Sequence, residues 1–403
     1  MKNYVSKIAV LCLAVLMACQ TTPKTISDNS SLVPKIKQAI ADIQKEYIKD
    51  KRTTRFEFEA KLENGKVVLT GDTEVEAARK SLLEKLKSQH IDFEDKTELT
   101  PSQNLEKKYG IIRVSVANLR SAPRHSAELA TQSTLGTIVK IYKKQNAWYL
   151  IQTPDRYLAW VDGGAIQEAD NEQVMDWQNA PKLLYTQATG FSFASPDANT
   201  QSVSDVVWGN VFKDLGTEKD FQKIGYPDGR EAFLPKNQVQ KLENWTKETQ
   251  LTQQNLVLCA KKMMGLPYLW GGTSFKGVDC SGFTKTVYMM NGWIIPRDAS
   301  QQIHEGEEID SSKGFEKLEI GDLLFFGEKA TENKPEKVIH VGMWIDNNEF
   351  IHSSNFVRIG SMDEKAGNFD AYERNRFLRA KRFLNKKTAG ILPAYQAFEA
   401  QKN

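Results

Sequence analysis

The feature that most constrains this chain is an internal repeat. Two neighbouring stretches align without gaps at a constant offset of 73 residues. Bulky and turn-forming residues recur at matching places: Gly136 with Gly209, Trp148 with Phe221, Ile151 with Ile224, Pro154 with Pro227, Asp155 with Asp228, Trp160 with Phe233 and Ile166 with Val239. Ungapped agreement at so many positions indicates a duplicated domain. Short alternating strands between turn signals predict that each copy is a small antiparallel barrel.

The size and charge of the chain limit the possible classes of protein. Its 403 residues are 40% apolar and 26% charged, which is ordinary globular material but too long for a single hydrophobic core. This composition excludes a disordered, collagen-like or polytopic membrane chain. With 54 basic and 51 acidic residues the net charge is only +3, so no overall field would hold nucleic acid. We therefore expect a multidomain α+β protein without a nucleic-acid partner.

Residues 1–19 have the pattern of an export signal. Lys2 and Lys7 precede an apolar run that is too short to span a bilayer. Residues 16–19, with the sequence LMAC, resemble the lipobox of bacterial lipoproteins. The resemblance implies that the mature chain carries lipid on Cys19, which would anchor it to a bacterial membrane, facing the periplasm or cell envelope. The alternative is a plain secretory signal with an incidental cysteine.

The next segments predict a tether and a small α/β module. Residues 20–32 are rich in Ser and Thr and indicate a flexible tether. Residues 33–101 show a helical stripe, two alternating strands joined at Asn64 and Gly65, a second helical stripe and a last strand. This order resembles a BON-type module. None of its residues forms a catalytic pattern.

The two repeat copies occupy residues 109–170 and 180–243. The first copy resembles the bacterial SH3-like domains of cell-wall proteins, so we expect two SH3-like β-barrels. Tyr149, Tyr157 and Trp160 of the first copy could form a ligand surface, although packing in the core is the commoner use of such aromatic residues. The second copy has arginine in place of Tyr157, so a role of this tyrosine would not be repeated.

A nucleophile is predicted where the third region begins. Asp279 is a natural N-cap for the helical pattern that follows it, which places Cys280 in the first helical turn. Free amide groups and the helix dipole favour a thiolate there, so we expect a Cys280 pKa well below that of a free thiol. Cys259 lies among apolar residues of a helical pattern and is expected to be a buried, inert thiol.

A base is predicted on the strands that follow. His340 and Gly342 share one face of an expected strand, and the next strand could bring His352 beside His340 as its orienting partner. A helix with a cysteine followed by a sheet with a histidine is the papain-like order. A metal site made of both histidines and a carboxylate lacks paired ligand spacing, so we expect no metal and no cofactor.

Four stretches identify a family resemblance over residues 250–386. In order and spacing they resemble the NlpC-type cysteine peptidases of bacterial cell walls: residues 279–282, 321–323, 340–342 and 350–352. With two barrels ahead of this region, the architecture is similar to the γ-D-glutamyl-L-diamino-acid endopeptidases of the dipeptidyl-peptidase VI type. These enzymes trim murein peptides that have a free N-terminal L-alanine.

The resemblance implies roles for individual residues. Cys280 would be the nucleophile, His340 the base and His352 the residue that orients the base. Substrate or oxyanion contacts would come from the remaining residues of the motif and from the first barrel: Tyr268, Asp279, Ser281 and Tyr157. Among these, Asp279 would face the free ammonium of the substrate and Tyr157 would cap its alanine end. The usual serine of the family is Ala299 here.

Two functions remain open on the sequence alone. One is a peptidase that cleaves the γ-D-glutamyl-diamino-acid bond of murein peptides during cell-wall turnover or recycling. The other is a catalytically silent lipoprotein that binds peptidoglycan as a scaffold. Diaminopimelate and lysine are equally compatible with the third substrate position. Residues 387–403 are expected to form a C-terminal tail.

Overall fold

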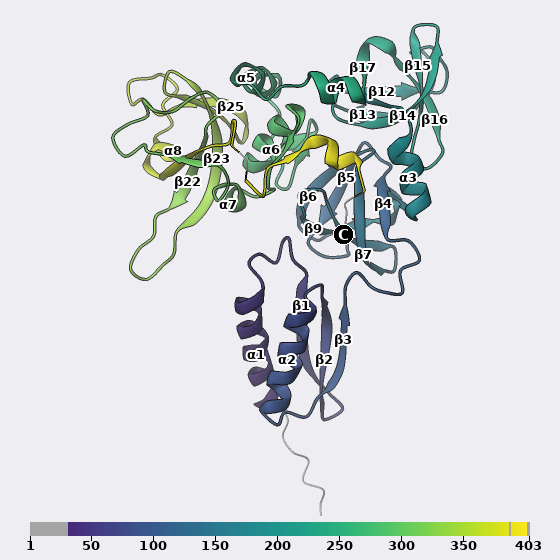
Figure 1. Cartoon of the computed structure of the whole chain (residues 1–403). Coiled ribbons are helices and arrows are strands. Elements are labelled where there is room, and N and C mark those ends of the chain that lie inside the picture. The colour runs from purple at the N-terminus through teal and green to yellow at the C-terminus, as the bar shows by residue number, and fades with distance from the viewer. Residues whose placement is uncertain (1–30, 387, 401–403) are drawn as a thin grey trace, which may run out of the picture.

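The computed structural model describes residues 31–386 and 388–400, which form an N-terminal module, two barrels and a catalytic domain (Figure 1). The expected export signal and Cys19 lie outside the described residues. Among the helices that are described, none is both long and apolar enough to cross a bilayer.

The N-terminal module packs two helices on a three-stranded sheet of order β1-β2-β3. Its elements are α1 (Leu32–Tyr47), β1 (Phe56–Glu63), β2 (Lys66–Thr73), α2 (Glu76–Ser88) and β3 (Glu94–Leu99). Strands β1 and β2 are antiparallel and turn at Asn64 and Gly65, both of which have positive φ, as the hairpin signal predicted. Apolar residues of both helices and of β1 and β2 form one core, so the module is a separate packing unit.

The two barrels have the same architecture. The first contains β4 (Tyr109–Ile112), β5 (Val116–Arg120), β6 (Leu129–Thr134), β7 (Ile138–Gln145), β8 (Trp148–Gln152), β9 (Leu158–Asp162) and β10 (Ile166–Ala169). The second contains β11 (Lys182–Tyr185), β12 (Thr189–Phe193), β13 (Ser202–Val207), β14 (Val211–Glu218), β15 (Phe221–Gly225), β16 (Glu231–Pro235) and β17 (Val239–Lys241). Their strand orders are β10-β4-β7-β8-β9-β5-β6 and, read in the same sense, β17-β11-β14-β15-β16-β12-β13. Corresponding strands begin 73 residues apart, as Ile138 and Val211 do.

Short helices connect the barrels to the catalytic domain. Helix α3 (Asn171–Asn179) follows the first barrel, and α4 (Leu242–Glu248) and α5 (Gln253–Lys262) follow the second. Helix α3 begins with a complete capping box between Asp170 and Gln173.

The catalytic domain places one central helix against an antiparallel sheet. The helix is α6 (Cys280–Met290), and the sheet has the order β21-β26-β22-β23-β24-β25. The sheet strands are β21 (Glu307–Ile309), β22 (Leu323–Glu328), β23 (Lys337–Asp346), β24 (Glu349–Ser354), β25 (Phe356–Ser361) and β26 (Phe377–Arg382). The smaller elements are β18 (Thr273–Ser274), β19 (Gly277–Val278), β20 (Trp293–Ile294), α7 (Ala299–Gln302) and α8 (Ala371–Asn375). This is the helix-and-sheet arrangement of the expected papain-like α+β domain.

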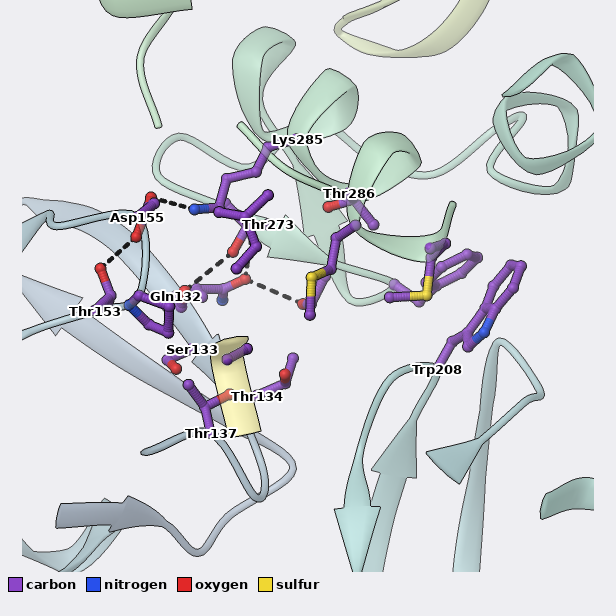
Figure 2. A pocket seen from close by; sticks show the side chains of 17 residues that line it. Gln132, Ser133, Thr134, Thr137, Thr153, Asp155, Trp208, Thr273, Lys285 and Thr286 are labelled. Atoms are coloured by element: carbon purple, nitrogen blue, oxygen red, sulfur yellow. Dashed lines mark hydrogen bonds and ion pairs between the residues drawn. The ribbon is translucent and has the colours of Figure 1, made fainter. Parts of the chain in front are cut away.

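The first barrel is docked on α6. Lys285 of α6 forms a buried ion pair with Asp155 of the first barrel, and both side chains point toward one another in Figure 2. Gln132 of β6 accepts hydrogen bonds from the Thr273 N–H, at 2.9 Å, and from the Ser274 hydroxyl, at 3.0 Å (Figure 2). These contacts fix the barrel beside the helix that carries Cys280.

The C-terminal tail expected for residues 387–403 contains regular structure where it is described. In its described part, β27 (Leu392–Pro393) pairs with β20 and is followed by the 3-10 helix η4 (Ala394–Phe398). Ala394, Ala397 and Phe398 are buried against Trp245 and Val211 of the second-barrel region. Figure 1 shows this yellow segment running from the catalytic domain toward the barrels. The small and aromatic residues of the segment bury apolar surface, and this explains why it packs.

Candidate active site

Asp279 begins α6 and sets the position of Cys280. Its side chain accepts a hydrogen bond from the Gly282 N–H at 2.7 Å, which is the predicted N-cap. The Gly271 N–H donates to the other carboxylate oxygen at 2.9 Å. A Cβ atom at Gly282 would collide with the carbonyl oxygen of Gly272, so this glycine is needed for the loop to approach the helix. These contacts hold the Gly271–Gly272 loop against the start of α6, next to Cys280.

Arg297 completes this network from the other side. Its guanidinium donates to both oxygens of Asp279, at 2.6 and 3.1 Å, and to the Ser281 hydroxyl at 3.0 Å. The Arg297 side chain is only 1% exposed. Both Asp279 oxygens are therefore occupied, and this argues against the expectation that Asp279 receives the substrate ammonium. The Ser281 hydroxyl belongs to the same network, because it also lies 3.4 Å from an Asp279 oxygen.

Cys280 lies against the strand that carries the predicted base. The backbone amide of Val341, the residue after His340, acts on the Cys280 sulfur, so α6 and β23 meet at this point. Burial raises the pKa of the Cys280 thiol to about 12, and the nearby Asp279 carboxylate raises it too, against the opposing effect of the Val341 amide. The expected low pKa is therefore wrong for the free protein, because burial outweighs the helix N-terminus.

His340 is neutral and paired with His352. Its Nε2 lies 2.8 Å from Nδ1 of His352, and this contact uses one of the two ring nitrogens of each histidine. Burial lowers the pKa of His340 well below its ordinary value, and the neighbouring His352 lowers it further. An uncharged imidazole can accept the thiol proton, so the resting pair is a neutral thiol and a neutral histidine.

His352 lies near an acidic group but is not hydrogen-bonded to it. It is fully buried on β24, and burial lowers its pKa to about 3. When Nε2 of His340 donates to Nδ1 of His352, the remaining His352 proton lies on Nε2. Among the described residues that Nε2 has no hydrogen-bond partner, and the nearest carboxylate oxygen, of Asp370, is 3.7 Å away. Asp370 is itself paired with Arg358 at 2.7 Å.

The same histidines could offer ligands to a metal ion. His340, His352 and Glu373 place one possible ligand atom each within 4.8 Å of one another. The two imidazoles, however, are hydrogen-bonded to each other, and Glu373 forms a two-pronged ion pair with Arg376 at 2.6 and 2.9 Å. Each of the three groups is therefore held by another side chain, and the contact between the two imidazoles fits acid–base chemistry.

The first barrel reaches the site through Tyr157. Tyr149, Tyr157 and Trp160 are all buried, but the Tyr157 hydroxyl donates to Oδ2 of Asp298 at 3.2 Å. Asp298 follows Arg297 in the sequence and precedes α7. Tyr157 therefore binds the residue next to Arg297, the partner of Asp279. Tyr268, on the opposite loop, is partly exposed and close enough for Cys280 to act on its phenol electrostatically. Burial raises the pKa of Tyr268, so the phenol stays protonated and can donate.

The comparisons with known proteins agree with this geometry. Residues 265–371 match the NlpC/P60 family and residues 115–167 match the bacterial SH3 domain. A γ-D-glutamyl-L-lysine dipeptidyl-peptidase of Bacillus cereus is 31% identical over 234 residues, which cover 56% of this chain and 67% of that protein. The chain belongs to the NlpC/P60 family. The sequence prediction of an NlpC-type cysteine peptidase is confirmed.

Two further relatives extend the match of this NlpC/P60 chain across the barrels. Dipeptidyl-peptidase 6 of Lysinibacillus sphaericus is 27% identical over 264 residues, covering 63% of this chain and 92% of that protein. A crystal structure of an NlpC/P60 family protein from Bacillus cereus has a TM-score of 0.58 and 26% identity. It covers 68% of this chain and 99% of its own, so about a third of this chain lies outside that match.

Sequence reasoning did not assign Arg297 and Asp298 to the site. Arg297 follows a proline and Asp298 precedes a helix, so both look like loop residues. The signal that could have found Arg297 was the predicted cap Asp279, because a carboxylate buried at a helix start needs a cationic partner.

The pH dependence of alkylation tests the ionisation of Cys280. Because the free thiol has a raised pKa, its reaction with iodoacetamide should be slow at pH 7 and rise about tenfold per pH unit up to about pH 10. The measurement is peptide mapping, which separates Cys280 from Cys259, whose pKa burial also raises to about 12. A rate that has already levelled off at pH 7 would mean that Cys280 is a thiolate.

Proposed function

We propose that this NlpC/P60 peptidase hydrolyses the γ-D-glutamyl-diamino-acid bond of murein peptides that have a free N-terminal L-alanine. The observation that carries the proposal is a cysteine at a helix N-terminus against β23, the strand that carries His340 in contact with His352. The relatives named for this activity support it. The alternative of a silent scaffold does not require a thiol, a base and an orienting histidine together.

The proposed reaction has two steps. The Cys280 sulfur attacks the γ-carbonyl carbon of D-glutamate while its proton passes to Nδ1 of His340. The oxyanion is stabilised by first-turn amides of α6, which lack helical acceptors, and by the protonated phenol of Tyr268. His340 then gives the proton to the departing amine of the diamino acid. Water hydrolyses the thioester and restores the thiol.

Asp298 is the better candidate for the substrate ammonium. Three carboxylates (Asp50, Asp279 and Asp298) and two guanidiniums (Arg52 and Arg297) gather at this corner, so one negative charge is left over. Arg297 binds Asp279 through two nitrogens and Arg52 binds Asp50 through two. Asp298 shares Arg52 with Asp50, since Nη1 of Arg52 lies 2.8 Å from its Oδ2, and its side chain is 27% exposed. A free ammonium would complete the charge balance there.

The assay for this function is incubation of the whole protein with L-Ala-γ-D-Glu-diaminopimelate and with the lysine peptide. Release of the free diamino acid together with L-Ala-D-Glu supports the peptidase. Binding without turnover of either peptide would support the scaffold.

We also propose that the exported chain is anchored by lipid on Cys19, on the basis of the lipobox-like residues 16–19. Cells that produce the protein should incorporate labelled palmitate into it, and Cys19→Ser should abolish the label. Palmitate on the Cys19→Ser variant would contradict the anchor.

For the other domains we propose that the second barrel is a second SH3-like domain and that the N-terminal module is BON-like. The shared strand order of the two barrels supports the first assignment. The helix–strand–strand–helix–strand order supports the second.

A further inference from the structure

The N-terminal module touches the catalytic domain at the corner that holds Asp298. The contact is made by the α1–β1 loop, residues 48–55. Nη1 of Arg52 donates to Oδ2 of Asp298 and to Oγ of Ser300, both at 2.8 Å. Gln301 donates to Asp50 of the same loop at 2.8 Å. Two side chains of the loop, Arg52 and Asp50, therefore bind the first turn of α7.

The same loop also holds the segment of the first barrel that carries Tyr157. The N–H of Leu158, the residue after Tyr157, donates to the Arg52 carbonyl oxygen at 2.7 Å. Nε2 of Gln152 donates to the Thr53 carbonyl oxygen at 3.2 Å. Arg52 thus contacts Asp298 with its side chain and the neighbour of Tyr157 with its backbone. Tyr157 and Asp298 themselves meet at this corner, where the Tyr157 hydroxyl donates to Asp298.

We propose that the α1–β1 loop of the N-terminal module is part of the substrate site, and that Arg52 is a specificity-determining residue for peptides with a free N-terminal amine. The inference rests on the proposed function. It gives the N-terminal module a part in substrate recognition. The catalytic residues and the barrels could be described without that part.

Arg52 forms ion pairs with both Asp50 and Asp298, so it shares its charge between the two carboxylates and also fixes their positions. Nε and Nη2 of Arg52 donate to the two oxygens of Asp50, at 2.9 and 2.7 Å. This pairing orients the planar guanidinium so that Nη1 points at Asp298. Asp298 keeps a fixed position and still carries charge for the ammonium of the substrate. Without Arg52, its partly exposed side chain can turn toward solvent.

Other contacts hold the module in place when Arg52 is changed. Lys143 of β7 pairs with Asp72 of β2 at 2.9 Å, and the Tyr142 hydroxyl donates to Glu74 at 2.9 Å. Neither contact includes Arg52, although Arg55 at the end of the same loop also binds Asp72 and Glu74. An Arg52 variant should therefore keep the module docked.

The test compares Arg52→Ala with the unchanged full-length protein on the free peptide and on its N-propionyl form. We expect KM for the free peptide to rise about tenfold or more and kcat to stay within about twofold. The substitution weakens substrate binding and leaves the chemical step unchanged. The preference for the free amine should fall at least about tenfold. Arg52→Lys should share most of this loss, since an ammonium cannot hold Asp50, Asp298 and Ser300 in one plane.

Lys51→Ala is the matched control, because it removes an exposed charge from the same loop and should leave both constants unchanged. Arg52→Ala or Arg52→Lys with wild-type preference would overturn the inference. A lower KM in Arg52→Ala would also overturn it, because Arg52 would then compete with the ammonium. If the unchanged protein shows no preference for the free amine, it is the proposed function that fails.

Discussion

Cys280→Ala should abolish release of the diamino acid, with a loss of roughly 10⁴-fold or more in kcat. The reason is that the sulfur forms the covalent bond in the proposed mechanism, and none of the described groups around it can replace that bond. Turnover is measured as free diaminopimelate by chromatography. Because Cys280 is buried at the start of α6 and alanine is smaller, the helix cap at Asp279 should survive.

Cys259→Ala is the control for this experiment. Cys259 is also a buried thiol, but it lies on α5 and has no histidine contact in the described structure. The Cys259→Ala variant should retain wild-type turnover. Comparable activity in Cys280→Ala would show that Cys280 is not the nucleophile. A loss of activity in both variants would indicate that the substitutions unfold the protein.

Acylation of the substrate amine should lower kcat/KM about 100-fold or more. N-Propionyl-L-Ala-γ-D-Glu-diaminopimelate lacks the positive charge that would balance Asp298, and a lost charge-assisted interaction of roughly 3 kcal/mol corresponds to that factor. The acyl group would also meet the closed corner formed by Tyr157 and Arg52. The measurement is kcat/KM on both peptides under identical conditions.

A glycine peptide separates charge from shape. Gly-γ-D-Glu-diaminopimelate keeps the ammonium and loses one methyl group, so its kcat/KM should fall less than about tenfold. Asp298→Asn should lower kcat/KM for the free peptide and leave the slow cleavage of the N-propionyl peptide nearly unchanged. Equal rates on free and acylated peptides would exclude Asp298 and Tyr157 as ligands of the amine end.

The sequence predicted local features of the site well. Asp279 caps α6 as expected, since an N-cap depends on residues only three apart. His340 and His352 meet because they lie on adjacent antiparallel strands, β23 and β24, whose pairing follows from a short hairpin. The offset of 73 residues likewise predicted two barrels of equal strand order, because a duplicated sequence keeps its pattern of turns.

Features that depend on burial and on contacts between domains could not be predicted. The pKa of Cys280 depends on how completely the core of its own domain covers it, and burial reverses the direction expected from the helix N-terminus. Arg52 and Asp298 are 246 residues apart in the sequence, and Tyr157 and Asp298 are 141 apart. No local pattern at Arg52 distinguishes it from a solvated loop residue.

The central claim, that Cys280 attacks the γ-D-glutamyl carbonyl with His340 as its base, is tested most directly by trapping the thioester. The full-length protein is mixed with L-Ala-γ-D-Glu-diaminopimelate, quenched in acid within the first turnover and analysed by peptide mass spectrometry. We predict an added mass equal to the L-Ala-γ-D-Glu acyl group, which is the dipeptide less one water, on the peptide that contains Cys280, and no added mass in His340→Ala. Product formation in the first turnover without this adduct, or an adduct on another residue, would contradict the account.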